Sequence, residues 1–418
     1  MAEFKATRSQ QAAIETRGRA VLVSAAAGSG KTKVLTERLL SRISDDADID
    51  SFLIITFTKA AAAELKSRIV DEIAKRLAAE PDNRRLRRQS ALCQKAQIGT
   101  IHSFCAAFLR ENCHEAGLSP EFKVIEEDRS EAIRARVIGR VMDAAYEKPT
   151  PEFLLLADSV GAGRDDSRLA EIVLSLHKKM QSHARPDLWA KKQIELMSVG
   201  ADDIAATPWA QEILNFVTAS AGFWAQAMED AAQKAYSNEK IGAAYGESLS
   251  ATALGLRDLA RSSADGWDRA RQFLPIEFPK LKSLRNSPDP ELSEHIKALR
   301  DSCKKAAGKL ADMLSASEEK LASDMQKTAP AMRALLELTL DFDKAYAAEK
   351  KRRAEVDFAD LEHFTARLLT DEAGEPTALA RELSQRYTEI MVDEYQDVNR
   401  VQDAIFRAVS KDGTNLFM

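Results

Sequence analysis

Short apolar runs, each followed by a helical pattern, occur near both ends of the chain. The runs are rich in Val, Ile, Leu and Phe and have the length of buried β-strands. We predict strands at residues 20–24, 52–58, 97–101, 389–394 and 415–418. After each of the first four strands, apolar residues recur at the spacing of an amphipathic helix. Strands that alternate with helices predict a parallel sheet with helices on both faces, which is the α/β class.

A long helical segment separates the third predicted strand from the fourth. The third strand ends at residue 101 and the fourth begins at residue 389, a gap too long for a connection within one sheet. The intervening sequence is rich in Ala, Leu, Lys and Glu, which favour helix. Breaks are predicted at residues 148–151, 161–166, 206–210, 274–279 and 286–290, where Pro or Gly interrupts the pattern. We therefore predict one lobe made of residues 1–125 and 355–418, and a helical insertion of residues 126–354.

The stretch "SAAAGSGKT" (24–32) lies between the first predicted strand and its helix. Gly28 and Gly30 allow backbone N–H groups to surround an anion, and the helix N-terminus adds a favourable dipole. Lys31 can then reach the β and γ phosphates of a nucleotide, and the Thr32 hydroxyl can bind Mg²⁺. The alternative is a glycine-broken helix start, and the strand–loop–helix context favours the nucleotide site. The strict phosphate-loop pattern has Gly where this chain has Ala25. The residues expected at the nucleotide are Ala27, Gly28, Ser29, Gly30, Lys31, Thr32 and Lys33.

A second motif, "IMVDEYQD" (390–397), ends the fourth predicted strand with two acidic residues. Asp393 is placed to hold Mg²⁺, and Glu394 to activate the attacking water as a general base. An Asp-Glu pair at a strand end could also be a helix cap. Together with the glycine loop, the pair favours a site that hydrolyses nucleoside triphosphates.

Composition and charge bear on four further kinds of site: nucleic-acid surfaces, membrane spans, disulfides and zinc sites. The formal net charge of −5 does not indicate a nucleic-acid binder, so any such site must be local. No apolar run reaches the ~18 residues of a membrane span, so no membrane contact is predicted. The four cysteines lack the spacing of a disulfide framework, which favours the reducing cytoplasm. Cys105 and Cys113, although near two histidines, lack the paired spacing of a zinc site.

Two basic runs, residues 83–89 and 349–355, stand out from the otherwise mixed charges. Runs of this kind are usually solvated helix faces, and that is the prediction for both. Phosphate contact is the alternative, because both runs flank sheet segments.

Four stretches occur in the order found in the UvrD/Rep-like superfamily 1 DNA helicases, and the chain resembles that family. The stretches are "SAAAGSGKT" (24–32), "ITFTKAAAAELKSRI" (55–69), "IGTIHSFCAAFLR" (98–110) and "VDEYQD" (392–397). The family commonly has Ala at the first loop position, which accounts for Ala25. "VDFADLEHFTARLL" (356–369) resembles the segment by which the chain re-enters the first lobe. The resemblance implies a RecA-like P-loop lobe with a 1B-like helical insertion. It also implies an ATP- and Mg²⁺-dependent motor that moves along single-stranded DNA and unwinds duplex DNA.

The resemblance also implies roles for individual residues. "TRSQQAAI" (7–14) resembles the adenine-reading motif, with Gln10 as its glutamine. Lys31, Asp393 and Glu394 would be catalytic, and Gln396 would sense the γ-phosphate and the attacking water. Thr32 and Asp393 would hold the metal. The residues expected to face DNA are Phe57, Thr58, Lys59, Thr100, His102, Ser103 and Phe104.

Within the family, the chain is most similar to AddA-type helicase–nuclease subunits of bacterial double-strand break repair. That similarity implies cytoplasmic, nucleoid-associated action and an AddB-like nuclease as the partner of the whole protein. The family's next segment, Gly-Asp-x-x-Gln, does not follow before Met418, so we expect a chain truncated before a second lobe and any nuclease domain. A UvrD/Rep-like repair helicase without nuclease, and an ATP-switched DNA-binding module, are the alternatives. For residues 1–418 alone we expect nucleotide binding with slow hydrolysis.

Overall fold

The computed structural model describes residues 6–26, 28–45, 47–160, 167–197 and 201–418. The predicted nucleotide contact Ala27 and the predicted break at 161–166 lie outside the described residues. The chain divides into two compact units, Met1–Ala190 with Leu335–Met418, and Lys191–Ala334. The first unit contains every strand of the described chain.

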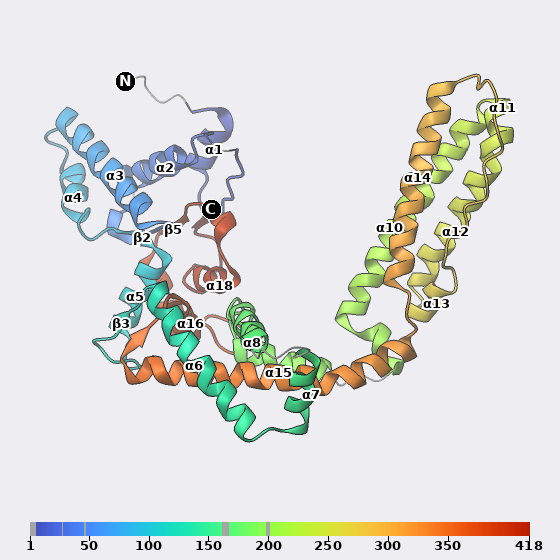
Figure 1. Cartoon of the computed structure of the whole chain (residues 1–418). Coiled ribbons are helices and arrows are strands. Elements are labelled where there is room, and N and C mark those ends of the chain that lie inside the picture. Colours follow the sequence, from blue (N-terminus) through green and yellow to red (C-terminus); the bar gives the residue numbers. More distant parts are fainter. Residues whose placement is uncertain (1–5, 27, 46, 161–166, 198–200) are drawn as a thin grey trace. The chain divides into compact units, whose positions relative to one another are not determined.

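A four-stranded parallel sheet forms the centre of the first unit (Figure 1). Its strands are β2 (Gln97–Thr100), β1 (Phe52–Thr56), β5 (Glu389–Val392) and β6 (Leu416–Phe417), in that spatial order. Every residue of β1 and β5 is buried, as their continuous apolar sequence requires. The prediction of an α/β fold with a parallel sheet is confirmed, and four of the five predicted strands are present with slightly shorter bounds.

The first predicted strand, residues 20–24, is wrong as a strand. It is reduced to one parallel bridge, between Val21 and Phe417. Val21 N–H donates to the Leu416 carbonyl at 2.9 Å, and Met418 N–H donates to the Val21 carbonyl at 2.8 Å. The segment therefore lies along β6 at the sheet edge. It has a neighbour on one side only, and Leu22 is exposed, so less holds it extended than holds β1.

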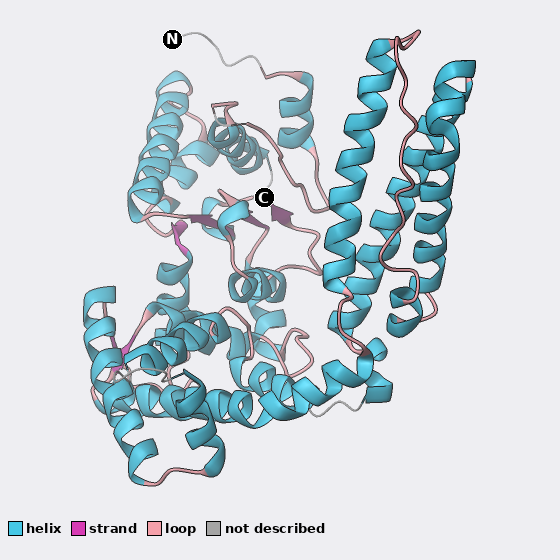
Figure 2. Ribbon diagram, turned by 45° about the vertical axis from the view of Figure 1, so that its right-hand side comes forward, coloured by secondary structure: helices cyan, strands magenta, loops and turns pink. Residues whose placement is uncertain are grey.

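Helices cover both faces of the sheet (Figure 2). Alternate residues of β1 point to opposite faces: Leu53 and Ile55 join one buried cluster, and Phe52 and Ile54 join another. The Leu53 side is covered by α5 (Ile101–Glu111), α16 (Phe358–Leu369), α17 (Ala378–Arg386) and α18 (Arg400–Ala408). The Phe52 side is covered by α1 (Arg8–Glu15), α2 (Lys31–Asp45), α3 (Lys59–Ala79) and α4 (Arg84–Leu92). The result is a three-layered core.

The sheet-bearing unit extends into the segment predicted as the insertion. It includes α6 (Glu127–Glu147), α7 (Pro151–Val160), α8 (Ser167–Met180), part of α9 (Pro186–Leu196) and the end of α15 (Glu318–Arg352). A short parallel ladder, β3 (Lys123–Val124) with β4 (Glu355–Val356), was not predicted. Polar contacts bind these helices to α15: Ser130 Oγ lies 2.7 Å from Tyr346 Oη, and His177 Nε2 lies 3.0 Å from Asp343 Oδ1. The compact units therefore have bounds other than the predicted 126 and 354, and the insertion as a functional domain stays a prediction.

Every regular element among the described residues of the second unit is helical, as predicted. Its elements are η2 (Ala201–Ala206), α10 (Pro208–Tyr236), α11 (Glu239–Ile241), η3 (Gly242–Gly246), α12 (Glu247–Ser263), α13 (Trp267–Arg271), α14 (Pro290–Met313) and the first part of α15. The predicted breaks hold here, since Thr207 caps α10 and no helix covers residues 274–289. Pro330, by contrast, lies inside α15. In the part of the chain that the structure describes, no helix is long and apolar enough to cross a membrane.

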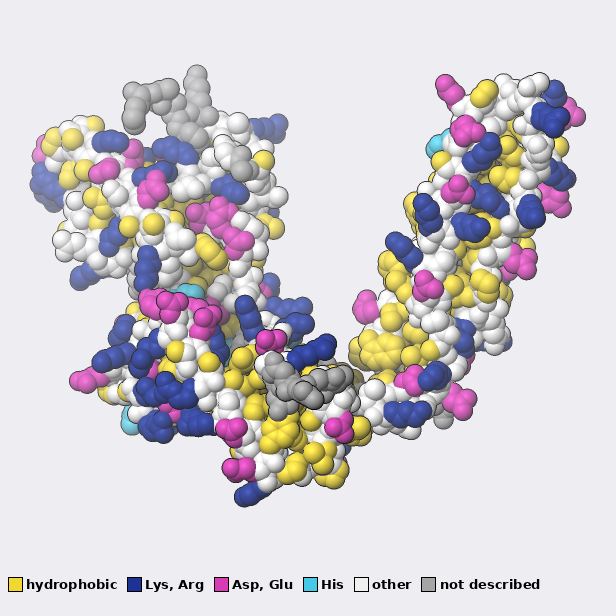
Figure 3. Space-filling view, in the orientation of Figure 1, with side chains coloured by type: hydrophobic (Ala, Val, Ile, Leu, Met, Phe, Trp, Pro, Cys, Tyr) yellow, Lys and Arg dark blue, Asp and Glu magenta, His cyan; other side chains and the backbone are white. Residues whose placement is uncertain are grey.

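The two basic runs are mostly solvated, as predicted, with Arg84, Arg87, Arg88, Lys351 and Arg352 exposed, but Arg85 and Lys350 are not. Arg85 donates to the Ile43 and Ala47 carbonyls, both at 2.8 Å, and so caps the end of α2. Lys350 is buried, with Nζ 2.8 Å from Asp357 and 2.6 Å from Asp360. Arg353, directly after α15, together with Arg140 of α6 and Arg352, pairs with the Glu349 carboxylate and lowers its pKa to about 2. On the face shown in Figure 3, Lys and Arg side chains gather where α6 crosses the end of α15.

Candidate nucleotide and DNA site

The glycine loop runs directly into the N-terminus of α2. Gly28 and Gly30 have φ of +76° and +87°, a backbone region that favours glycine. The helix begins at Lys31, and Val34 N–H donates to the Gly30 carbonyl at 3.0 Å. The N–H groups of a first helical turn have no acceptor within the helix itself, and this is the arrangement that binds anions at helix N-termini.

The loop and the acidic strand end line the same hollow. A cavity of about 540 Å³ lies in front of the loop, and a neighbouring cavity of about 400 Å³ reaches Asp393. Lys31, Glu394 and Gln396 line both. The first is lined by Gly28, Ser29, Gly30, Lys31, Thr32, Lys33, Arg68, Glu394 and Gln396. The structure therefore brings together the described nucleotide residues that the sequence predicted from segments at opposite ends of the chain.

Lys31 connects the two motifs. Its Nζ lies 3.4 Å from the Ala25 carbonyl and 3.8 Å from Glu394 Oε2. Residue 25 contacts Lys31 through its main-chain carbonyl and not through its side chain. Alanine at this position is therefore compatible with the site. The ammonium is half-buried, which keeps it at the loop and leaves it accessible to phosphate.

Asp393 and Glu394, which follow β5, have carboxylates in different surroundings. Asp393 N–H donates to the Ile55 carbonyl at 2.8 Å, which fixes Asp393 beside β1. Burial raises the pKa of Asp393, and the nearby charge of Glu394 raises it further. Glu394 has φ 56° and ψ 47°, a left-handed conformation that costs about 1–3 kcal/mol for a residue other than glycine. This turn directs the chain into η4 (Tyr395–Asp397), and Gln396 Nε2 donates to Glu394 Oε2.

The residues present fit a bound Mg²⁺. The Thr32 hydroxyl and the Asp393 carboxylate are the oxygen ligands that Mg²⁺ prefers, usually completed by water and phosphate. Burial and the neighbouring Glu394 raise the pKa of Asp393, and a cation bound beside it would favour its charged form. No group of three or more His, Cys, Asp or Glu residues that could hold a metal by themselves occurs among the described residues.

Gln10 lies against the loop. Its Nε2 donates to the Ser29 carbonyl at 3.1 Å, and its Oε1 accepts from Thr7 N–H at 2.9 Å in a capping box of α1. The oxygen and the nitrogen of the Gln10 side-chain amide therefore both form hydrogen bonds with the main chain. Its role in reading adenine stays a prediction.

Sequence reasoning missed Arg68, which lines the phosphate cavity from α3. Its guanidinium pairs with Glu64 at 2.5 Å, one turn earlier in the same helix. The only signal in the sequence was its place inside "ITFTKAAAAELKSRI", where the helix face cannot be read without the fold. The structure describes both basic runs in full, and none of their arginines lines this cavity.

The predicted DNA residues lie at the carboxyl ends of β1 and β2. Phe57 is 67% exposed directly after β1, and Lys59 begins α3. Thr58 caps that helix, accepting from Ala61 N–H at 3.0 Å. An exposed aromatic beside a lysine and a helix N-terminus suits a base and its phosphate.

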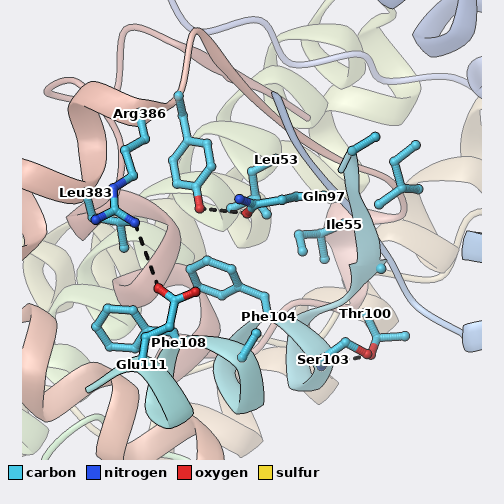
Figure 4. Close-up of a pocket in the computed structure, with 15 residues that line it drawn as sticks. Leu53, Ile55, Gln97, Thr100, Ser103, Phe104, Phe108, Glu111, Leu383 and Arg386 are labelled. Atoms are coloured by element: carbon cyan, nitrogen blue, oxygen red, sulfur yellow. Dashed lines mark hydrogen bonds and ion pairs between the residues drawn. The ribbon is translucent and has the colours of Figure 1, made fainter. Parts of the chain in front are cut away.

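The segment after β2 is more enclosed. Thr100 is buried and caps α5, accepting from Ser103 N–H at 3.2 Å, while the two hydroxyls lie 2.9 Å apart. Ser103 and Phe104 line a cavity of about 340 Å³ beside β2, with Phe108 stacked behind Phe104 (Figure 4). His102 is half-buried, with Nε2 3.0 Å from Glu362. Thr100 lines the same cavity, and the DNA contacts of this segment stay a prediction.

Comparison with known proteins agrees with this geometry. Residues 6–418 match the model of the UvrD/REP helicase N-terminal domain. The chain is 35% identical to an ATP-dependent helicase/nuclease subunit of Clostridium novyi over 98% of its own length and 34% of the relative's. Proteins of that name from Acetivibrio thermocellus (34% identical, 97% of this chain and 34% of the relative) and Desulforamulus reducens (35% identical, 100% and 34%) are similar too. The chain spans about a third of the length of these relatives. The predicted resemblance is confirmed, and the chain belongs to the UvrD/REP helicase family.

Proposed function

We propose that this chain is the ATP-binding motor portion of an ATP-dependent DNA helicase, with a RecA-like lobe and a 1B-like helical insertion. One observation carries the proposal: Lys31, Thr32, Glu394 and Gln396, from the two ends of the chain, line a single hollow at a helix N-terminus. Helices with this layout bind nucleotide phosphates.

In this proposal each residue has a defined task at the phosphates. The loop N–H groups and the Lys31 ammonium hold the β and γ phosphates. Thr32 and Asp393 would hold Mg²⁺, and a metal ion bound there would supply positive charge beside the phosphoryl group. Glu394 orients and deprotonates the attacking water, and Gln396, hydrogen-bonded to Glu394, reports the γ-phosphate to the following turn.

Single-stranded DNA would cross the carboxyl ends of β1 and β2. Ligands of open parallel sheets bind beyond these strand ends, and Phe57 is the exposed aromatic there. The names of the relatives support action together with a nuclease. We therefore propose that the whole protein acts on single-stranded and duplex DNA in double-strand break repair, in the cytoplasm at the nucleoid, with an AddB-like partner.

Fluorescence anisotropy with a labelled oligothymidylate tests the DNA part. Phe57→Ala should weaken binding by about 1–3 kcal/mol, the scale of one base–aromatic stack. Affinity should also fall steeply with salt. Phe216→Ala is the control, because Phe216 is a similarly exposed phenylalanine (55%) on α10, in the unit whose described residues form no strand. Wild-type affinity in Phe57→Ala, or no binding by the wild type, would count against the proposal.

A further inference from the structure

A buried carboxylate links the predicted DNA segment to the segment that follows Glu394. Glu362, on α16, accepts hydrogen bonds on both of its oxygens. Gln402 Nε2 donates to Oε1 at 2.6 Å, and Asn399 Nδ2 donates to Oε2 at 3.0 Å. His102 Nε2, on the first turn of α5, lies 3.0 Å from the same Oε1. Three side chains from two other helices thus converge on one carboxylate.

Asn399 gives this contact a direct connection to the nucleotide site. Its Oδ1 caps α18 by accepting from Gln402 N–H at 2.8 Å, while its Nδ2 donates to Glu362. The cap lies only three residues after Gln396 and two residues after the end of η4. A shift of the turn that carries Glu394 and Gln396 therefore moves the cap, and the cap is held by Glu362.

The charge on Glu362 is maintained inside the core. Burial by itself would raise the pKa of Glu362, but hydrogen bonds from His102, Gln402 and Asn399 outweigh burial and lower it. A carboxylate that accepts from several donors cannot be replaced by an amide without leaving donors unpaired. Because α16 packs against both α5 and α18, the three helices keep this contact together.

We propose that Glu362 is a positioning residue that couples the nucleotide site to the DNA-facing end of α5 by holding His102 and the cap of α18 in one fixed relation. The inference rests on the proposed function. His102 uses Nε2 toward Glu362, so its Nδ1 edge is the one left to face DNA. A nucleotide that moves η4 would thereby change the orientation of His102 towards DNA. In the same way, DNA that moves His102 would change the position of η4. Coupling of this kind is reciprocal, so it can be measured from either side.

The test measures oligothymidylate affinity of the 418-residue chain with and without the imidotriphosphate analogue of ATP plus Mg²⁺. The ratio of the two dissociation constants is the coupling factor, and we expect about 5-fold or more for the wild type. Glu362→Gln keeps size and removes the carboxylate. Asn399→Ser keeps a good helix cap and removes only the donor to Glu362. Glu382→Gln, an exposed carboxylate on α17, is the matched control.

The inference predicts that the factor falls towards one in Glu362→Gln and Asn399→Ser and stays at the wild-type value in Glu382→Gln. Nucleotide affinity without DNA should stay that of the wild type in all three variants. A wild-type coupling factor in Glu362→Gln overturns the inference, and so does a wild-type factor of one. A parallel loss of both affinities and of the melting temperature also overturns it, since that is the mark of a merely structural residue. Failure of the wild type to bind nucleotide or DNA at all would instead contradict the proposed function.

Discussion

Arg38 and Glu389 form a buried ion pair between α2, which follows the glycine loop, and β5, which precedes Asp393. Arg38 Nη2 lies 2.5 Å from Glu389 Oε1, and the two side chains are 1% and 5% exposed. Arg38 Nε donates to both carboxylate oxygens at 3.1 Å, and Nη1 donates to the Ala13 carbonyl at 2.5 Å. The guanidinium also lies 4.8 Å from the centre of the Phe417 ring. One arginine therefore holds α1, α2, β5 and β6 together behind the candidate nucleotide site.

Removing either partner should be costly. Arg38→Met leaves the Glu389 carboxylate buried without its cation, and loss of one member of a buried pair costs about 3–5 kcal/mol. Domains of ordinary stability have about 5–15 kcal/mol in total, so the loss is a large share. Glu389→Met should cost a similar amount. The double variant removes both charges and fills the space with apolar atoms, so it should recover most of the loss.

Hydrogen exchange followed by mass spectrometry measures the loss of stability separately in each of the two compact units of the chain. Peptides of β1 and β5 should lose roughly two to three and a half powers of ten in protection in each single variant. Peptides of α10 and α12, in the other unit, should exchange as in the wild type. Arg407→Met removes an exposed pair with Asp403 and should cost less than about 1 kcal/mol. Single variants as mild as Arg407→Met, or a double variant as costly as the sum of the singles, would refute the reasoning.

Three further outcomes follow from the site and its surroundings. Residues 1–418 should hydrolyse ATP slowly and with little stimulation by DNA, because the resemblance to UvrD/Rep-like helicases implies arginine fingers, worth about 10³ to 10⁵ in rate, that come from a second lobe. Steady-state phosphate release decides this, and strong DNA-stimulated turnover that Glu394→Gln abolishes would show the expectation to be wrong. Arg68→Ala should weaken Mg–ATP binding by about 1.5–3 kcal/mol and Mg–ADP binding less, whereas equal effects on both in calorimetry would place Arg68 away from the γ-phosphate. The pKa of Glu362 is lowered from 4.5 in the folded chain, so its carboxylate stabilises the fold above pH 4.5 and loses that effect as the pH falls through the folded pKa. Urea midpoints recorded from about pH 6 to pH 3 should therefore fall less in Glu362→Gln than in the wild type, and parallel profiles would contradict the assignment.

The sequence predicted the sheet best where burial on both faces made the strand continuous and apolar. β1 and β5 are of this kind, and both were placed within two residues. Residues 20–24 have the same composition but lie at the sheet edge, where a single neighbour leaves one bridge. Edge position is a property of the topology, so no local pattern reveals it.

The residues of the candidate nucleotide site could be picked out in the sequence because glycine, lysine and paired carboxylates do chemistry that few other patterns need. Lys350 was not predictable, since its run reads as a solvated helix end until Asp357 and Asp360 fold back onto it. Glu362 is 260 positions from His102, and no spacing indicates that the two meet. Contacts of this kind depend on the packing of α5, α16 and α18.

The central claim is that the loop at Gly28–Thr32 and the carboxylates after β5 form one Mg–ATP site. Calorimetric titration of Mg–ATP into the wild type and Lys31→Ala tests it most directly. Loss of the ammonium should weaken binding by about 1–3 kcal/mol, the scale of a charge-assisted contact. Lys75→Ala, an exposed lysine on α3, should bind as the wild type does. Equal affinity in the wild type and Lys31→Ala, or no measurable binding by the wild type, would contradict the account.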